Sequence, residues 1–229
     1  MNWLLKQIFY FRYFVLKQRD FEYNLFSEIP WWIQKSRLFT EFASNSFTDS
    51  KWNKYLPWFE DFKVRQDWNT YGIFSQKYGK WYFKARLDGL IQRTSPIQGT
   101  YVPAIWMLDM RKKGEGKAGI DLYSKGYYYE VDIELQEDGL HLSFWANNNG
   151  GQNDPGRIHK KSVFRIRELK RRLQREYHLF LIDWSEEWLK FYINGILCAC
   201  FKNEIHVPMQ IICTKLSMQK IIIQHGRNI

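Results

Sequence analysis

The chain is divided into short runs of strand-forming residues, each bounded by turn residues, and this pattern is the feature that most constrains its fold. Within the runs, β-branched and aromatic side chains either alternate with polar ones or form short apolar stretches, as is typical of β-strands. Many short strands joined by tight turns predict an all-β protein, either an antiparallel sandwich or a barrel. The expected strands cover residues 79–87, 101–110, 127–135, 139–147, 178–184, 188–195, 196–202, 209–217 and 219–226.

Two local signals complete the expected secondary structure. Asn194 and Gly195 lie between two strand-like runs, and this pair is a strong signal for a tight hairpin turn. Residues 167–178 carry leucines and a tyrosine every four positions on an otherwise basic sequence, RELKRRLQREYH. This segment is expected to be one short helix or an ordered loop.

Composition favours a large core and a basic surface. Of the 229 residues, 45% are hydrophobic and 18% are aromatic, which argues against general disorder and suits one large domain. The aromatic residues exceed what a core needs, so some are expected to line a groove that stacks on sugar rings or bases. The net charge of +10 suits a nucleic acid, an anionic membrane surface or a sulfated polysaccharide, or simply a solvated basic surface.

The three cysteines, Cys198, Cys200 and Cys213, are odd in number and irregularly spaced. This arrangement argues against both a disulfide framework and a zinc site. Cys198 and Cys200 fall in an apolar strand-like run, so buried free thiols are expected.

Residues 1–36 are interpreted as an N-terminal extension, followed by a single domain over residues 37–229. Lys6 and Arg12 interrupt the apolar run, which leaves no stretch of the roughly 18 residues that a transmembrane helix needs. Neither an unbroken apolar region nor a small-residue cleavage site marks a clear signal peptide. The extension is expected to pack on the body of the protein or on a partner, with a membrane-surface segment as the alternative.

The stretch YYYEVDIELQED, residues 127–138, carries three acids at alternate positions: Glu130, Asp132 and Glu134. Side chains at i, i+2 and i+4 of a strand share one face, so Val131 and Ile133 point the other way, into a core. Like charges on one face are destabilising unless water or cations relieve them. One interpretation is a solvent-exposed polar face of an edge strand. The other is glycoside hydrolysis, which uses two carboxyl groups around one bond.

Glycoside hydrolysis sets a geometric condition on this strand. In retaining enzymes the two carboxyl groups lie about 5–5.5 Å apart. The Cα atoms of Glu130 and Glu134 would be roughly 13 Å apart on a flat strand, so the interpretation predicts a concave sheet on which the side chains lean together. Asp132 would hydrogen-bond to a neighbouring glutamate and help to separate the two glutamate pKa values.

The sequence EVDIE resembles the E-x-D-x-E signature of family 16 glycoside hydrolases, which include lichenases, laminarinases and xyloglucan transglycosylases. The flanking segments follow the family's order across residues 40 to 225. They are FTDSKW (47–52), FSQKYGKWYFKARL (74–87), GTYVPAIWMLDM (99–110), HLSFWANNNGG (141–151) and EYHLFLIDWSEEWLKFYING (176–195). The resemblance implies a concanavalin A-like β-jelly-roll of two curved antiparallel sheets, with few short helices and a concave face that holds an extended polysaccharide.

The resemblance also implies roles for the carboxylates in a retaining endo-β-glycanase or transglycosylase. Glu130 matches the nucleophile, Glu134 the acid/base and Asp132 the residue between them. The uninterrupted spacing is closer to lichenases and xyloglucan enzymes than to laminarinases, agarases or carrageenases. The candidate substrate-binding residues are Trp106, His141, Trp145, Asn147 and Tyr82.

Some positions depart from the family pattern. Tyr82 and Lys84 stand where the family usually has Glu and Arg, and His141 and Ser143 stand where it often offers Gln and Asn. These departures keep open a non-catalytic glycan-binding or attachment module on the same fold. A basic nucleic-acid-binding β protein is a third hypothesis, which rests on charge alone and predicts a steep salt dependence of binding.

For cofactors and partners, the resemblance implies a β-linked polysaccharide substrate, an anionic one included, and no organic cofactor or metal in the reaction. A structural Ca²⁺ is compatible with such folds, although no motif locates one. Nucleic acid is not the expected partner, and no transmembrane segment is expected. Members of the family usually act outside cells, so extracellular action is expected despite the lack of a clear signal peptide.

Overall fold

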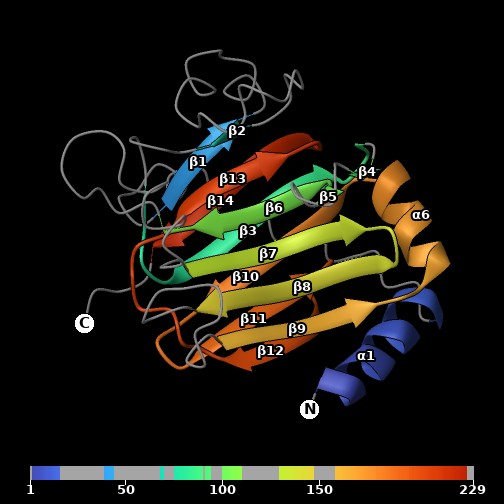
Figure 1. The fold of residues 1–229 in the computed structure, drawn as a ribbon, viewed down its shortest axis with the longest axis horizontal. Coiled ribbons are helices and arrows are strands. Elements are labelled where there is room, and N and C mark those ends of the chain that lie inside the picture. The colour runs from blue at the N-terminus through green and yellow to red at the C-terminus, as the bar shows by residue number, and fades with distance from the viewer. Residues whose placement is uncertain are drawn as a thin grey trace.

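The computed structural model describes residues 2–15, 39–43, 68–69, 75–89, 91–93, 100–109, 129–146 and 158–225. These residues form a sandwich of two antiparallel six-stranded sheets, with helices at one end (Figure 1). The expected all-β jelly-roll of two antiparallel sheets is therefore confirmed.

The first sheet, sheet A, has the strand order β1-β14-β3-β10-β11-β12 and lies behind sheet B in Figure 1. Its strands are β1 (Phe39–Ala43), β14 (Ser217–His225), β3 (Gly79–Arg86), β10 (His178–Trp184), β11 (Trp188–Ile193) and β12 (Ile196–Lys202). The expected hairpin at Asn194 and Gly195 joins β11 to β12. Both residues have positive φ, 48° and 73°, the conformation for which an Asn-Gly pair is suited.

The second sheet, sheet B, has the order β2-β13-β6-β7-β8-β9. Its strands are β2 (Trp68–Asn69), β13 (Gln210–Thr214), β6 (Ala104–Leu108), β7 (Tyr129–Gln136), β8 (Gly139–Ala146) and β9 (Ile158–Phe164). A separate small sheet pairs β4 (Gln92–Arg93) with β5 (Thr100–Tyr101). The chain passes between sheets A and B after β1, β2, β3, β9, β12 and β13, so that each sheet is assembled from distant parts of the sequence.

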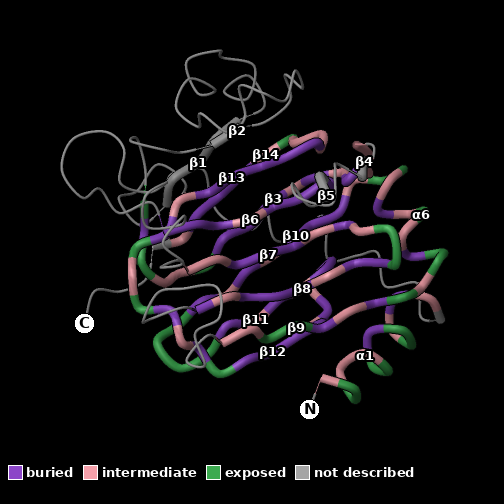
Figure 2. The backbone as a smooth tube through the Cα atoms, in the orientation of Figure 1, coloured by how far each residue is buried: buried purple, intermediate pink, exposed green. Residues whose placement is uncertain are grey.

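The core lies between the two sheets because alternate side chains of each strand point inward. Trp81 and Phe83 of β3 meet Val131 and Ile133 of β7 in one continuous cluster of buried apolar residues. Figure 2 shows buried residues running along the strands of both sheets. The three cysteines are free and buried, as expected.

Two expectations about the strands need correction. The strand expected over residues 101–110 is broken, since β5 ends at Tyr101 and β6 begins at Ala104. Pro103 lies at this break and has no N–H to donate to a ladder. The edge strand β9 was not expected at all. Its sequence, IHKKSVF, exposes Lys160 and Lys161 to solvent and therefore does not show the usual alternation.

Helix α6 (Arg167–Arg175) connects sheet B to sheet A, which confirms the helical alternative for this segment. Leu169 and Leu173 are fully buried, and these two leucines fix the helix against the end of the sandwich. The helix ends before Tyr177, because Glu176 takes an extended conformation and donates its N–H to the carbonyl of Arg172.

The described part of the N-terminal segment, residues 2–15, packs on the body of the protein, one of the two arrangements expected for the extension. Helix α1 (Asn2–Tyr10) continues into one π-helical turn, η1 (Phe11–Val15), and α1 lies against β12. Phe9 is fully buried, stacks on Tyr13 and meets Phe164 edge-on. The Tyr13 hydroxyl bonds to Nε2 of His178 at 2.5 Å, and burial lowers the pKa of this histidine. Among the described residues, no helix is long and apolar enough to cross a membrane.

Candidate active site

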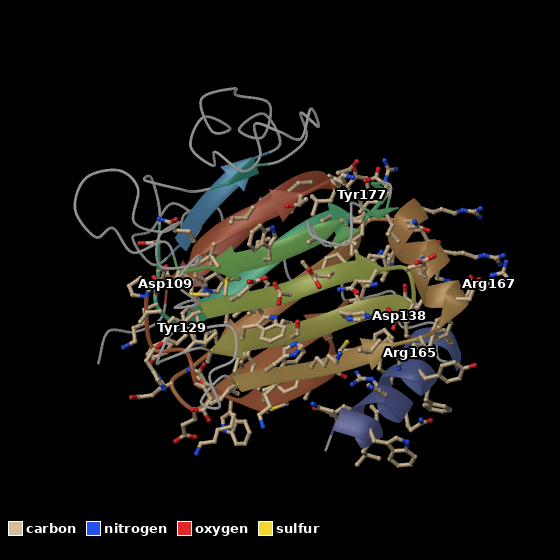
Figure 3. All side chains as sticks on the ribbon, viewed as in Figure 1. Asp109, Tyr129, Asp138, Arg165, Arg167 and Tyr177 are labelled. Atoms are coloured by element: carbon tan, nitrogen blue, oxygen red, sulfur yellow. The ribbon has the colours of Figure 1, made fainter. Side chains whose placement is uncertain are left out.

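The candidate site lies on the outer face of sheet B, across β6, β7 and β8. Val131, Ile133 and Leu135 of β7 join the core, so the alternate residues of this strand face away from it. The three expected carboxylates, Glu130, Asp132 and Glu134, therefore share this outer face. In Figure 3 the site lies along β7, between labelled Tyr129 at its start and labelled Asp138 in the turn that follows it.

The antiparallel register gives each carboxylate two cross-strand neighbours. Asp132 pairs with Trp106 of β6 and Ser143 of β8. Glu134 pairs with His141 on the β8 side, and Glu130 pairs with Trp145. Directly opposed residues have Cβ atoms about 4.5–5.5 Å apart, so these neighbours form the immediate surroundings of the acids. Four of the five candidate substrate-binding positions are described, and three of them are gathered here.

Asp132 is the most enclosed of the three acids, with only 1% of its surface exposed. The Ser143 hydroxyl donates to its Oδ2 at 3.0 Å. Its other oxygen, Oδ1, has no donor among the described residues. Burial raises the pKa of Asp132 well above its ordinary value, and the charges of Glu130 and Glu134 raise it further. A side-chain hydrogen bond with Glu130 also raises the pKa of Asp132, because it favours the protonated form of this carboxyl group.

Glu134 also has a raised pKa, and the main cause is burial. Two neighbours oppose this rise. The Gln136 amide donates to its Oε2 at 2.8 Å, and His141 stabilises its charged form. The environment of Glu134 thus favours a carboxyl group that holds its proton to a higher pH than an exposed glutamate does.

His141 is held from the turn between β7 and β8. Its Nε2 lies 2.6 Å from Oδ1 of Asp138, and the guanidinium Nε of Arg165 donates to the other Asp138 oxygen at 3.1 Å. The pKa of Asp138 is lowered, first by the hydrogen bond with His141. The fixed Asp138 carboxylate orients the imidazole on the strand position directly opposite Glu134.

Two tryptophans flank the acids on opposite sides of β7. On β6, half-buried Trp106 donates its indole N–H to the Thr214 hydroxyl at 2.9 Å. On β8, Trp145 stacks on His159 with ring centroids 3.3 Å apart and an interplanar angle of 7°. Both rings are thereby fixed in orientation beside the carboxylates.

The remaining two candidates do not join this arrangement. Tyr82 lies on β3 of sheet A, where Trp81 and Phe83 fill the core and Tyr82 faces outward with Leu179 and Ile222. The prediction that Tyr82 contacts the substrate is corrected by this placement, since both sheets separate it from the acids. Burial raises its pKa to about 12. Asn147 lies outside the described residues.

Several residues of the site were not among the predicted ones. Ser143, Gln136 and Asp138 could have been found from the sequence, because a two-residue turn at 137–138 fixes every pair between β7 and β8. Thr214 and His159 reach the site through strands β13 and β9, whose register no local signal determines. Among the described residues, no group of three or more His, Cys, Asp or Glu side chains could hold a metal ion.

Comparisons with known proteins found similarity only among solved structures. No family model matches the chain, and no curated protein matches it. A Bacteroides ovatus mixed linkage glucan GH16 in complex with a G4G4G3G product is 18% identical, with a TM-score of 0.44 over 70% of this chain and 61% of that chain.

Two further structures show the same level of similarity. The laminarinase catalytic domain from Thermotoga maritima is 20% identical, with a TM-score of 0.43 over 69% of this chain and 66% of that chain. The Bacillus licheniformis β-glucanase is 14% identical, with a TM-score of 0.42 over 70% and 71%. The chain thus spans less than two thirds of the length of the first two structures. These likenesses assign neither an activity nor a substrate to it.

Proposed function

We propose that the outer face of sheet B is the active site of a glycoside hydrolase that cleaves a β-linked polysaccharide with retention of configuration. The observation that carries the proposal is the row of three carboxyl groups on one face of β7, with Asp132 buried between Glu130 and Glu134. Such a row is electrostatically unfavourable, and an exposed polar strand face would not enclose its central acid. The resemblance of EVDIE to the family 16 signature supports the same assignment.

In the proposed reaction, Glu130 attacks the anomeric carbon while Glu134 gives its proton to the glycosidic oxygen. The bond from the anomeric carbon to that oxygen breaks, and a covalent ester to Glu130 forms. Glu134, now a carboxylate, then takes a proton from water or from an acceptor sugar hydroxyl. The resulting oxygen nucleophile attacks the anomeric carbon and releases Glu130. Hydrolysis and transglycosylation differ only in this acceptor.

The environments of the acids suit these roles. The raised pKa of Glu134 keeps a proton available for the leaving oxygen, which is what a general acid requires. The proton on Asp132 stabilises negative charge on Glu130 when the ester breaks. Ser143 holds Asp132 in place from β8, so the proton is directed along the face of the sheet.

The polysaccharide is proposed to cross the strands of sheet B. Trp106 and Trp145 lie on either side of β7 and offer ring faces for sugars on the two sides of the scissile bond. Binding on both sides of the bond suits endo-acting cleavage. His141, next to Glu134, is proposed to meet a sugar hydroxyl close to the cleaved bond.

The test is glycan cleavage by Glu130→Gln and Glu134→Gln, compared with Glu186→Gln as a matched control. Glu186 is an exposed glutamate in the turn before β11, on the other sheet. On a panel of lichenan, laminarin, xyloglucan, agarose, carrageenan and porphyran, the wild type and the control should release reducing ends. The two site variants should lose about 10³-fold or more in kcat, because each removes a group that takes part in bond making or breaking.

The roles can be separated by azide rescue with an activated aryl glycoside. Azide added to Glu134→Ala attacks the covalent intermediate and should give a β-glycosyl azide. Azide added to Glu130→Ala attacks from the opposite face and should give the α-azide. Full activity of Glu130→Gln would disprove the proposal. Wild-type protein that binds a glycan without cleaving any would favour the non-catalytic glycan-binding alternative.

A further inference from the structure

Helix α1 presents an apolar face to solvent on the side opposite to its packing surface. Phe9 and Tyr13 are buried against the sandwich, whereas the alternate face of the helix is open. Five large apolar residues of the α1–η1 segment are exposed, with Trp3 at 71% and Leu4 at 57%. The others are Ile8, Tyr10 and Phe11. At 100° per residue all five fall within one half of the helix circumference, and only Gln7 interrupts them.

Such a face is unusual for a surface helix. Isolated exposed apolar residues are ordinary, but a contiguous apolar patch marks a surface that contacts something else. Phe11 is the first residue of η1, which follows α1 without a break, so Phe11 continues the face that begins at Trp3. We call these five residues the α1 apolar face.

The surroundings of the α1 apolar face are cationic. The described residues 2–15 contain two cations, Lys6 and Arg12, but no acid. Lys6 lies over the Phe164 ring, and its pKa is lowered by burial and then by the nearby charge of Arg165. Two cations are therefore held close together beside the helix, and one of them, Arg165, is also paired with Asp138.

Helix α6 adds to this charge. It carries five basic residues and one acid, Glu168, and it contacts the N-terminal segment through Arg172, whose guanidinium lies over the Tyr13 and Phe14 rings. Figure 3 shows Arg165 and Arg167 projecting at the same end of the molecule as α1. Arg167 and Arg171 are exposed.

We propose that the α1 apolar face docks on the surface of an anionic lipid bilayer, with the helix lying in the plane of the interface. An interfacial helix combines an apolar face that enters the boundary of the acyl chains with cations that meet the headgroups. Trp3 and Tyr10 are the residue types that favour the headgroup level. The basic residues beside α1 and on α6 supply the attraction to anionic lipid.

A second copy of the chain fits this face less well than a membrane does. In a two-fold contact the same patch meets itself, so Lys6, Arg165 and α6 of both copies would be brought together. The described residues 2–15 contain no acid that could offset these charges. An anionic bilayer covers the apolar residues and neutralises the cations at the same time.

The test is sedimentation of the full-length protein with phosphatidylcholine vesicles and with vesicles of phosphatidylcholine and phosphatidylserine in equal parts. The wild type should bind the anionic vesicles at least about tenfold more tightly than the neutral ones, and added salt should weaken that binding. The double variant Trp3→Gln/Leu4→Gln should lose about tenfold or more in affinity, because two large side chains no longer enter the interface. Trp188→Gln, which alters an exposed tryptophan on β11, is the matched control and should bind as the wild type does.

The charge contribution is tested separately. Arg167→Gln/Arg171→Gln should weaken binding to the anionic vesicles and leave binding to the neutral ones unchanged. Lys77→Gln/Lys80→Gln removes two cations near the start of β3, away from α6, and should have a smaller effect. Brominated lipid should quench part of the tryptophan fluorescence of the wild type, and that part should be absent in Trp3→Phe.

Thermal melts check that the variants are folded. The variants should melt as the wild type does, because the changed side chains point outward. Failure of the wild type to bind anionic vesicles would overturn the proposal, as would unchanged binding of Trp3→Gln/Leu4→Gln. A different result would assign the face to a second copy of the chain. In that case the wild type would not bind vesicles but would self-associate in sedimentation velocity, and Trp3→Gln/Leu4→Gln would abolish this self-association. None of these outcomes depends on glycan cleavage.

Discussion

The hydroxyl of Ser143 donates a hydrogen bond to Oδ2 of Asp132 at 3.0 Å, and the two residues lie directly opposite each other on β8 and β7. This contact is the one described donor to a buried acid that lies between two other acids. It fixes the orientation of the Asp132 side chain, which also hydrogen-bonds with Glu130.

Ser143→Ala should destabilise the fold by about 1–3 kcal/mol, because Oδ2 of Asp132 would then be buried without its donor. Glycan-cleaving activity should fall as well, since Asp132 is no longer held in position. Urea unfolding measures the first effect and kcat the second. Ser162→Ala is the matched control: Ser162 is equally buried on β9, but its hydroxyl has no partner among the described residues. A loss of stability in Ser162→Ala equal to that in Ser143→Ala would contradict the assigned role.

Asp132→Asn should change how stability depends on pH. The pKa of Asp132 is raised in the folded state, so the folded protein binds a proton that the unfolded chain releases above about pH 4. Wild-type stability therefore carries a penalty that is absent below this pH and grows as the pH rises toward the folded pKa. Asparagine cannot titrate, so the variant should gain stability relative to the wild type as the pH rises.

The measurement is the free energy of unfolding of both proteins from acidic to neutral pH. Asp138→Asn is a useful comparison because the sign reverses: the pKa of Asp138 is lowered, and its contribution to stability is lost on acidification. Its exposed position makes that effect small. A constant stability difference between wild type and Asp132→Asn across this range would show that Asp132 ionises normally.

Gln136→Ala should move the alkaline limb of the pH–activity profile to higher pH. Gln136 donates to Glu134 and lowers its pKa, so removing this bond raises the pKa and the acid keeps its proton longer. His141→Gln should move the limb in the same direction, because the electrostatic interaction with His141 also lowers the pKa of Glu134. The profile of kcat/KM against pH measures both, and Gln174→Ala on α6 serves as the control. If the alkaline limb of Gln136→Ala moved to lower pH instead, Glu134 would not be the general acid.

Phe9→Ala should lower the free energy of unfolding by about 3–5 kcal/mol, because it leaves a cavity at a fully buried position of α1, where the Phe9 ring contacts Tyr13 and Phe164. Phe11→Ala should cost far less, since Phe11 is 52% exposed. Chemical denaturation measures the free energy of unfolding of both variants, which differ only in the position changed within one helical segment. Equal losses would mean that the segment is not anchored through Phe9.

Much of the strand content followed from local sequence, and so did the row of acids. The pattern in YEVDIEL predicts which side chains leave the core, and the Asn194–Gly195 turn predicts the hairpin of β11 and β12. These features depend on residues close together in the chain, where periodicity and turn chemistry decide the conformation.

What the sequence does not reveal depends on contacts between distant segments. The alternating pattern of β3 predicts which side chains lie on each face of the strand, but it does not predict to which sheet the strand belongs. The expectation for Tyr82 is wrong for this reason, since Tyr82 lies on the side of the molecule away from the acids. The enclosure of Asp132 likewise requires the neighbours that β6 and β8 bring to it. The strand β9 was missed because an edge strand exposes polar residues on both faces.

The N-terminal segment is held by groups that come much later in the chain. Tyr13 bonds to His178, Asn2 accepts from the backbone N–H of Cys200, and Arg172 covers Tyr13 and Phe14. During synthesis the residues that leave the ribosome first therefore find their partners only after most of the chain has followed. Closure of such long-range contacts is slow, so Phe9 and Tyr13 stay open to chaperones, or to other growing chains, until translation is nearly complete.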